Sequence, residues 1–466
     1  MTQVGTATKR GGRRWWVLVV MCLAIFMMNL DITIVNVALP DMMKSLDVGL
    51  PAIEWVMNAY VLVFAVLMVT LGKLGDLRGR KLLFMGGLAV FTLASLTCGL
   101  APNEHVLVVS RAVQGAGAAA MMPATLSIIN VAFADSGRGM ALGIWGGAAG
   151  AAAALGPIIG GALVQAHSWR LIFLINVPIG IVAFIAAAFI VAESTDPKTD
   201  RRLDIPGVIA ISIALFCVSF GLVEGEGYGW TSAPILGLFG LAAVALVAFV
   251  FIERRALAPV VRLGLLRDRA FSAGNAVGAA MMFATIGILF AMSVFLQGPL
   301  GFGAFKTGLI LLPLPAIYMI TTPVSGRLSD KMGGRWLMFF GMLLAALGAY
   351  LMAHVSSSTS WQQLMAPLAV AGLGIGLCVA PTTCAVMASV PVAHSGEAAG
   401  ILSTMRQIGA SLAVSLIGAI LQTGGGVTAE GIDRALTVIM FFCVAGAAAA
   451  LLVRSTVSKG PPVAAT

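Results

Sequence analysis

Asp31 is the residue of this sequence that is best placed to carry chemistry, because it is the only carboxylate deep within a long apolar run. A carboxylate in hydrocarbon costs several kcal/mol, so such a residue usually faces a cavity or a partner. A low dielectric penalises the charged form of a carboxyl group, which lets the group take up and release a proton. Asp31 is therefore the predicted proton carrier. The alternative is a structural ion pair without a transport role.

Arg111 is the predicted partner of Asp31. At about 1.5 Å per residue, Asp31 lies about 24 Å along its run from Trp15, and Arg111 lies about 8 Å into its own run from the opposite boundary. The two charges are thus expected at similar depth, where the approach and withdrawal of Arg111 would couple conformation to proton occupancy. Alternatively, Arg111 only extends toward the water surface. Gln114, one helical turn further on, could share the polar network.

Few other residues suggest chemistry. Arg406 and Gln407 are a polar pair within an apolar run and could line a cavity or hold neighbouring carbonyls, and Asn36 is a further candidate for a cavity. No phosphate-binding loop and no Ser-His-Asp or Cys-His arrangement stands out. The four histidines lie singly, and the six cysteines lie in apolar runs. We therefore expect no metal, no cofactor and no disulfide framework.

The segment 143–161 is rich in glycine and contains Pro157. Glycines at four-residue spacing let helix backbones approach closely, and proline bends a helix. A helix of this kind could act as a pivot or a seal, although ordinary helix packing explains the glycines equally well.

The composition identifies the elements that position these residues. The chain has 466 residues, 59% of them hydrophobic and 10% charged, and its mean hydropathy is +1.01. Soluble domains carry about 25% charged residues, and apolar runs of about 20 residues match the bilayer. The sequence predicts an all-α polytopic membrane protein with 14 transmembrane helices. These lie near 15–39, 53–71, 82–101, 106–133, 139–166, 171–192, 205–223, 233–252, 271–297, 307–325, 336–354, 362–388, 397–421 and 434–453.

Positive charge gathers on one side of the predicted membrane. With the N-terminus inside, the inner loops and tails hold most of the Lys and Arg residues, so both termini are predicted to be cytoplasmic. The basic residues are spread over all inner loops, which accounts for the net charge of +9 without a nucleic-acid partner.

An internal repeat indicates two related halves. GKLGDLRGRK (72–81) and GRLSDKMGGR (326–335) each follow an apolar run and share Gly, Asp four residues later and Gly three residues after that. Parallel repeats are a transporter architecture, with the substrate site between the halves near the midplane. The predicted domains are an N-terminal six-helix bundle (1–193), a linker with two inserted helices (194–270) and a C-terminal six-helix bundle (271–466).

Five segments together resemble the major facilitator superfamily, and more narrowly its 14-span drug:proton antiporter branch. GKLGDLRGRK is similar to the signature loop of the superfamily, and LVVSRAVQGAGAAA (107–120) is similar to its span-4 motif. ALGPIIGG (154–161) resembles the antiporter motif. LDITIVNVALP (30–40) and WRLIFLINVPIG (169–180) look like motifs of the 14-span branch.

The resemblance implies a role for each matching residue. Asp31 would be the protonation site and Arg111 its coupled cation. The antiporter hinge would consist of Gly156, Pro157, Gly160 and Gly161. An inner latch would consist of Gly72, Asp76, Gly79, Arg80 and Lys81, with Asp76 pairing with Arg80 and with the positive end of a helix from the other half. The second copy departs from the pattern at Arg335, so its latch is expected to be weaker.

These observations predict a monomeric antiporter of the bacterial inner membrane that exports drugs or toxic amphipathic compounds in exchange for protons by alternating access. One buried carboxylate can hold either a proton or a cationic substrate, and this competition gives exchange. The alternative transporter handles one defined metabolite, such as a self-made antibiotic or a nutrient. A membrane-embedded enzyme or a sensor is the alternative from another class. A cluster of buried catalytic groups would favour the enzyme, and a long soluble domain would favour the sensor. Neither feature stands out in the sequence, so no enzyme activity is expected.

Overall fold

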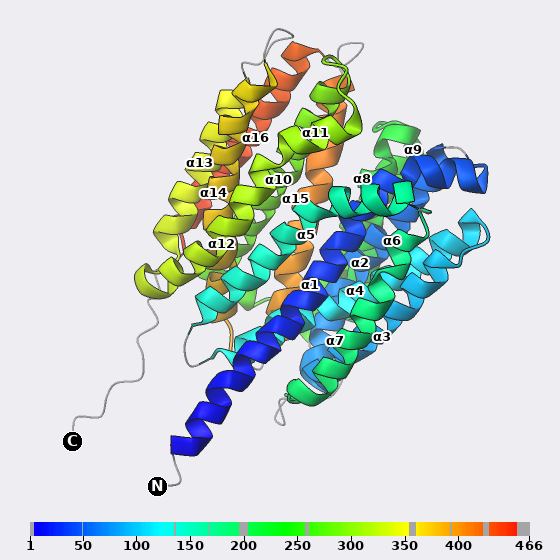
Figure 1. Cartoon of the computed structure of the whole chain (residues 1–466). Coiled ribbons are helices and arrows are strands. Elements are labelled where there is room, and N and C mark those ends of the chain that lie inside the picture. The colour runs from blue at the N-terminus through cyan, green and yellow to red at the C-terminus, as the bar shows by residue number, and fades with distance from the viewer. Residues whose placement is uncertain are drawn as a thin grey trace. The chain divides into compact units, whose positions relative to one another are not determined.

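The computed structural model describes residues 4–48, 50–134, 137–166, 168–194, 204–256, 261–353, 360–391, 394–422 and 428–453. Within these ranges every regular element is a helix, and 14 helices are long and apolar enough to cross a membrane (Figure 1). The predicted all-α fold with 14 membrane-spanning helices is confirmed. In chain order the elements are α1 (Val4–Leu46), α2 (Leu50–Arg78), α3 (Arg80–Gly99), α4 (Glu104–Ala132), α5 (Arg138–Ala166), α6 (Leu171–Leu174), α7 (Asn176–Ile190), α8 (Ile205–Tyr228), α9 (Ala233–Arg255), the 3-10 helix η1 (Leu265–Arg267), α10 (Arg269–Gln297), α11 (Ala304–Leu311), α12 (Pro313–Met332), α13 (Arg335–Ala353), α14 (Trp361–Ala388), α15 (Ser395–Gln422) and α16 (Ala429–Ala450).

The chain forms two compact units. The first consists of Met1–Ile128, Ala151–Gly264 and Pro391–Thr404, and the second of Ile129–Gly150, Leu265–Val390 and Met405–Thr466. Helices α4, α5 and α15 therefore each contribute one part to each unit. The predicted domain boundaries at 193/194 and 270/271 follow the sequence repeat and stay a prediction.

Two of the predicted spans are each built from two helices. The span near 171–192 consists of α6 and α7, and Ile175 between them keeps helical angles (φ −61°, ψ −29°). Pro178 has no N–H to donate to the carbonyl of Leu174, which accounts for the interruption. The span near 307–325 is divided in the same way at Leu312, where Pro313 and Pro315 follow.

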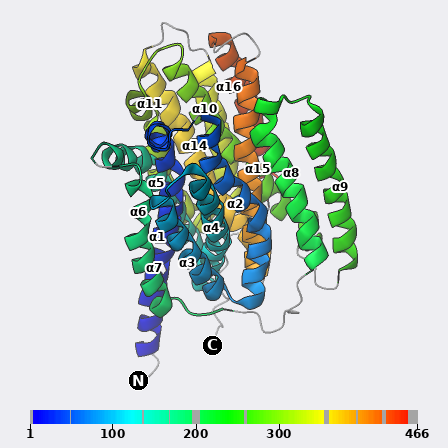
Figure 2. The same cartoon turned by 90° about the vertical axis from the view of Figure 1, so that its right-hand side faces the viewer.

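In the first unit, α1, α2, α3, α6 and α7 pack on one another. An apolar cluster that includes Leu30, Ile34 and Phe173 surrounds the middle of α1. The two inserted helices, α8 and α9, form a hairpin whose α8 lies along α2 (Figure 2). Because α9 contacts mainly α8, its other face leaves apolar side chains such as Val244 and Phe251 exposed, as expected for a helix in lipid.

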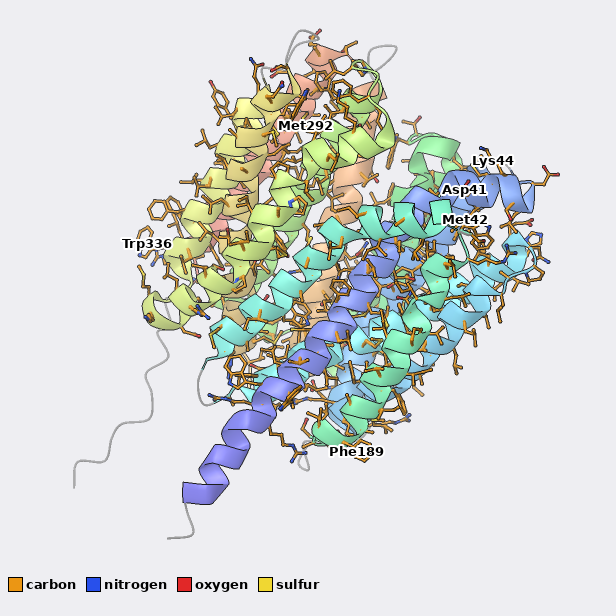
Figure 3. The ribbon with its side chains drawn as sticks, viewed as in Figure 1. Asp41, Met42, Lys44, Phe189, Met292 and Trp336 are labelled. Carbon is orange, nitrogen blue, oxygen red and sulfur yellow. The ribbon has the colours of Figure 1, made fainter. Side chains whose placement is uncertain are left out.

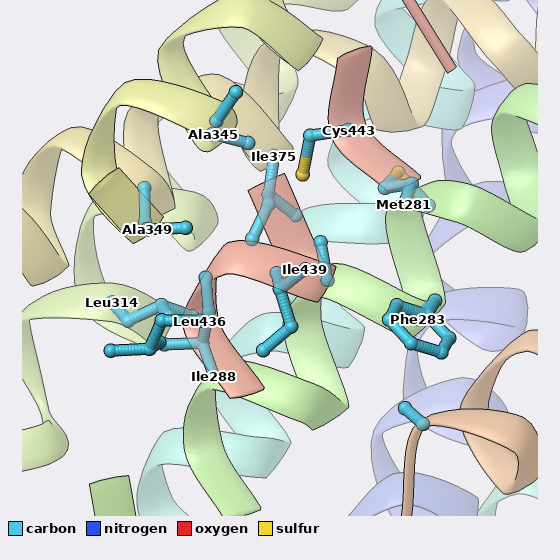
Figure 4. Packing of buried hydrophobic residues seen from close by; sticks show 14 of the residues in the cluster. Met281, Phe283, Ile288, Leu314, Ala345, Ala349, Ile375, Leu436, Ile439 and Cys443 are labelled. Carbon is cyan, nitrogen blue, oxygen red and sulfur yellow. The ribbon is translucent and has the colours of Figure 1, made fainter. Parts of the chain in front are cut away.

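In the second unit, α10, α12, α13, α14 and α16 enclose a larger apolar core. Met281 and Phe283 of α10, Ile375 of α14 and Ile439 of α16 belong to this core (Figure 4). Large apolar side chains also lie on the outside of both units, for example Phe189, which is 82% exposed in α7 (Figure 3). Exposed side chains of this size need an apolar surrounding, which a bilayer supplies.

Candidate functional site

The structure brings Asp31 of α1 and Arg111 of α4 into direct contact inside the first unit. Arg111 Nη1 donates to Asp31 Oδ2 at 2.5 Å. Gln114 Nε2 donates to Asp31 Oδ1 at 2.9 Å, and Gln114 Oε1 accepts from Arg111 Nη1 at 2.8 Å. One turn of helix separates Arg111 from Gln114, so both reach the same carboxylate from one face of α4.

Asn176, which the sequence analysis did not single out, completes this group. Its Nδ2 donates to Asp31 Oδ1 at 3.0 Å and to Ser95 Oγ at 3.1 Å. Asn176 is the first residue of α7, in the segment WRLIFLINVPIG that carried part of the family resemblance. A polar amide at that position within an apolar segment was a signal that could have identified it. We call Asp31, Arg111, Gln114 and Asn176 the Asp31 network.

Arg111 has further partners within the first unit. Besides its bonds to Asp31 and Gln114, its Nε donates to the carbonyl of Val56 at 3.0 Å. Its guanidinium carbon lies 4.3 Å from the ring centre of Tyr60 and 5.6 Å from that of Phe173. These contacts offset much of the cost of a buried cation.

All four side chains of the Asp31 network are buried, with Asp31 at 0% exposure. The network therefore holds its charges away from water in this conformation. The carboxylate of Asp31 is therefore closed to solvent in this structure.

Asp76 of the predicted inner latch lies at a second buried polar cluster. Arg80 donates to Asp76 Oδ1 from Nη2 at 2.8 Å and from Nε at 3.0 Å. The backbone N–H groups of Gly396 and Glu397 donate to Asp76 at 3.0 and 2.9 Å. These two N–H groups belong to the first turn of α15, where the helix dipole favours a negative charge.

The other predicted latch residues have different contacts. Gly72 lies so close to α15 that a Cβ atom would collide with the carbonyl oxygen of Gly396. Gly79 has φ +121° in the turn between α2 and α3, a conformation that favours glycine. Lys81 does not contact Asp76, because its Nζ donates to the carbonyl of Ala188 at 2.7 Å.

Glu397 is a latch residue that the sequence analysis missed. Its side chain is fully buried, and its Oε1 accepts from the backbone N–H of Arg262 at 2.6 Å. Lys73 Nζ lies 3.9 Å from Glu397 Oε2. Arg262 lies in the segment that follows the inserted helices, so Glu397 joins that segment to α2 and α15.

The repeat seen in the sequence has a structural counterpart in the second unit. Asp330 at the end of α12 accepts the backbone N–H groups of Gly139 and Met140, at 2.8 and 3.1 Å, in the first turn of α5. Gly333 in the following turn has φ +80°. Among the described residues no arginine or lysine pairs with Asp330, in contrast to Asp76, which has Arg80.

The predicted hinge residues lie in α5, which is a continuous helix from Arg138 to Ala166. A Cβ atom on Gly156 would collide with the hydroxyl of Thr33, and one on Gly160 would lie 2.8 Å from Ile34. These glycines therefore permit the close packing of α5 on α1. Gly161 has open space around its Cα, and the side chain of Pro157 lies outside the described residues.

Two of the remaining candidates for a cavity, Arg406 and Gln407, lie in the second unit. The side chain of Asn36 lies outside the described residues. Arg406 is buried in α15 and donates from Nη2 to Thr383 Oγ1 at 2.7 Å, within the second unit. Gln407, the next residue, is half-buried.

Comparison with known proteins shows the family. The family model described as Major Facilitator Superfamily matches residues 21–413 and 275–465. The chain is 37% identical over 407 residues to a methylenomycin A resistance protein of Bacillus subtilis, covering 87% of each chain. It is 36% identical over 400 residues to the multidrug resistance protein Stp of Mycobacterium tuberculosis, covering 86% of this chain and 74% of Stp.

Two further proteins extend the comparison. The tetracenomycin C resistance and export protein of Streptomyces glaucescens is 33% identical over 410 residues, which cover 88% of this chain and 76% of that protein. The crystal structure of the human organic anion transporter MFSD10 superposes with a TM-score of 0.67 at 13% identity, covering 92% of this chain and 99% of that one. The chain therefore belongs to the major facilitator superfamily, a family of membrane transporters, and its 14 spans and resistance-protein relatives are consistent with the 14-span drug:proton antiporter branch.

Proposed function

We propose that this protein exports drugs or toxic amphipathic compounds across the bacterial inner membrane in exchange for protons. The observation that carries the proposal is the Asp31 network, in which one buried carboxylate is bound by a buried arginine and two amides. The names of the relatives, which include a multidrug resistance protein and an antibiotic resistance and export protein, support drugs as the cargo.

In this mechanism the protonation of Asp31 changes the conformation. The charged carboxylate binds Arg111, which holds α1 and α4 together. Protonation removes the negative charge, so the guanidinium no longer has its counterion and the closed arrangement loses stability. A conformation open to the outside then loads Asp31 with a proton and releases cargo, and one open to the cytoplasm releases the proton.

The inner latch acts on the cytoplasmic side in the same cycle. Asp76 and Gly72 hold the first turn of α15 against α2 through two hydrogen bonds and a close backbone contact. Release of this contact would open the cytoplasmic side. In this proposal protons are the only coupling ion. Both termini lie in the cytoplasm, and the protein works as a monomer.

A narrower function is the export of one defined metabolite, such as a self-made antibiotic. Two relatives carry the name of a single antibiotic each, tetracenomycin C and methylenomycin A. A panel of substrates separates the two functions, because a multidrug exporter transports several unrelated members and a dedicated exporter transports one.

The test is efflux from proteoliposomes that hold the purified protein and carry an imposed pH gradient, with a panel of cationic and neutral amphipathic compounds. We expect efflux that follows the gradient and stops when a proton ionophore is added, whether or not ATP is present. Efflux that needs ATP, or that is indifferent to the gradient, would contradict the proposal.

A further inference from the structure

Arg406 is a buried cation that forms no ion pair with any residue that the structure describes. Its side chain is 6% exposed and lies in the part of α15 that belongs to the second unit. A guanidinium has five N–H donors. Between described residues one of them is used, in the 2.7 Å bond from Nη2 to Thr383 Oγ1, while Nε is buried and has no partner. No described carboxylate lies within ion-pair distance of Arg406.

The two buried arginines of the predicted spans differ in this respect. Arg111 has a carboxylate, an amide, a backbone carbonyl and two aromatic rings around it. Arg406 has one hydroxyl, and that hydroxyl already donates its own proton to the carbonyl of Val379 at 2.9 Å. The alternative from the sequence analysis, in which Arg406 holds neighbouring carbonyls, has no such bond among the described residues. Burial of a charge without a partner is costly, so a purely structural role does not account for Arg406.

The neighbours of Arg406 lie on two other helices of the second unit. Tyr318 of α12 lies close enough to Arg406 to interact with it electrostatically, and its side chain is largely buried. Thr383 lies on α14, so three helices of one unit converge on the guanidinium. A Cβ atom on Gly150 would collide with the ring of Tyr318, so the lack of a side chain there leaves room for that ring. A buried cation among apolar helices suits a ligand that combines a negative oxygen with an apolar body.

We propose that Arg406 is a specificity-determining residue that binds an anionic oxygen of the exported compound, so that amphipathic acids are preferred cargo. This inference rests on the proposed export function and assigns its substrate class. The anion supplies the counterion that Arg406 lacks among the described residues, and the remaining N–H donors bind it in the fork geometry that carboxylates fit. Asp31, in the first unit, then binds the proton and not the cargo.

The test measures binding, so it does not depend on whether export is driven by protons. Purified protein in lipid nanodiscs is titrated calorimetrically with 1-naphthylacetate and with 1-naphthylacetamide, which has the same apolar body without the charge. We expect the wild type to bind the acid about 10-fold or more tightly than the amide, since a hydrogen bond to a charged group is worth about that much. Arg406→Gln should reduce this ratio to about 2-fold or less, and Arg406→Lys should retain part of it.

Arg434→Gln is the matched control, because Arg434 is an exposed arginine on α16 that pairs with Glu430. This variant should keep the wild-type ratio. The thermal unfolding midpoint of each variant shows that the protein is folded. The proposal is overturned if the wild type binds the acid no better than the amide or fails to bind it, or if folded Arg406→Gln keeps the preference. Failure of proton-driven efflux with the binding preference intact would instead contradict the proposed function alone.

Discussion

The coupling between Asp31 and Arg111 can be measured by a double-mutant cycle of Asp31→Asn and Arg111→Gln. Each single change leaves one buried charge without its counterion, and breaking a buried ion pair costs about 3–5 kcal/mol. The double variant contains two neutral amides, and it loses only hydrogen bonds worth about 1–3 kcal/mol. The double variant should therefore be more stable than either single variant, with a coupling free energy of about 2 kcal/mol or more.

The assay is unfolding of the four proteins in detergent micelles, followed by circular dichroism. The control cycle uses Glu430→Gln and Arg434→Gln, which remove an exposed ion pair on α16 whose coupling should be about 1 kcal/mol or less. Additive effects of the two changes at Asp31 and Arg111 would contradict an ion pair between them, because each charge would then be compensated without the other.

Three further variants test other contacts. Asn176→Ala removes one neutral donor from the buried carboxylate of α1 and should cost about 1–3 kcal/mol of unfolding free energy, which the same unfolding assay measures; an unchanged midpoint would contradict the contact. Gly156→Ala forces a methyl group against a threonine hydroxyl of α1 and should lower the free energy of unfolding by about 1–3 kcal/mol. Gly161→Ala should leave it unchanged, because the space around Gly161 is open. Equal effects of the two changes would show that α5 does not pack closely on α1 there. Asp76→Ala should lower the free energy of unfolding by about 3–5 kcal/mol, because it breaks a buried ion pair. Asp330→Ala should lower it by only about 1–2 kcal/mol, because it removes a helix cap. The reverse order would contradict a weaker second latch.

The membrane helices and the depth of the buried charges could be predicted because both follow from local properties of the sequence. Apolar runs of bilayer length fix the helices, and the constant rise of a helix fixes how deep Asp31 and Arg111 lie. Two oppositely charged residues at the same depth in hydrocarbon are expected to form an ion pair, because each charge is costly there without a partner. The positive φ of Gly79 and Gly333 likewise fits the glycine that both copies of the repeat share three residues after the aspartate.

The contacts made by neighbouring helices could not be predicted in the same way. Glu397 lies at the predicted boundary of its span, where a carboxylate would be expected to face water, but α15 begins at Ser395 and its first turn packs against α2. Which helix covers that turn depends on tertiary packing, and the sequence does not contain this information locally. The same holds for Asn176, whose importance comes from the carboxylate that it meets on α1.

Transport in this proposal depends on the exchange of protons for cargo at the carboxyl group of Asp31. The most direct measurement follows the pH inside proteoliposomes with a trapped indicator while a saturating substrate gradient is applied, for the wild type and for Asp31→Asn. We predict that substrate movement through the wild type drives opposite proton movement, and that Asp31→Asn abolishes this proton movement while substrate-for-substrate exchange continues. Undiminished proton movement through Asp31→Asn would contradict the account.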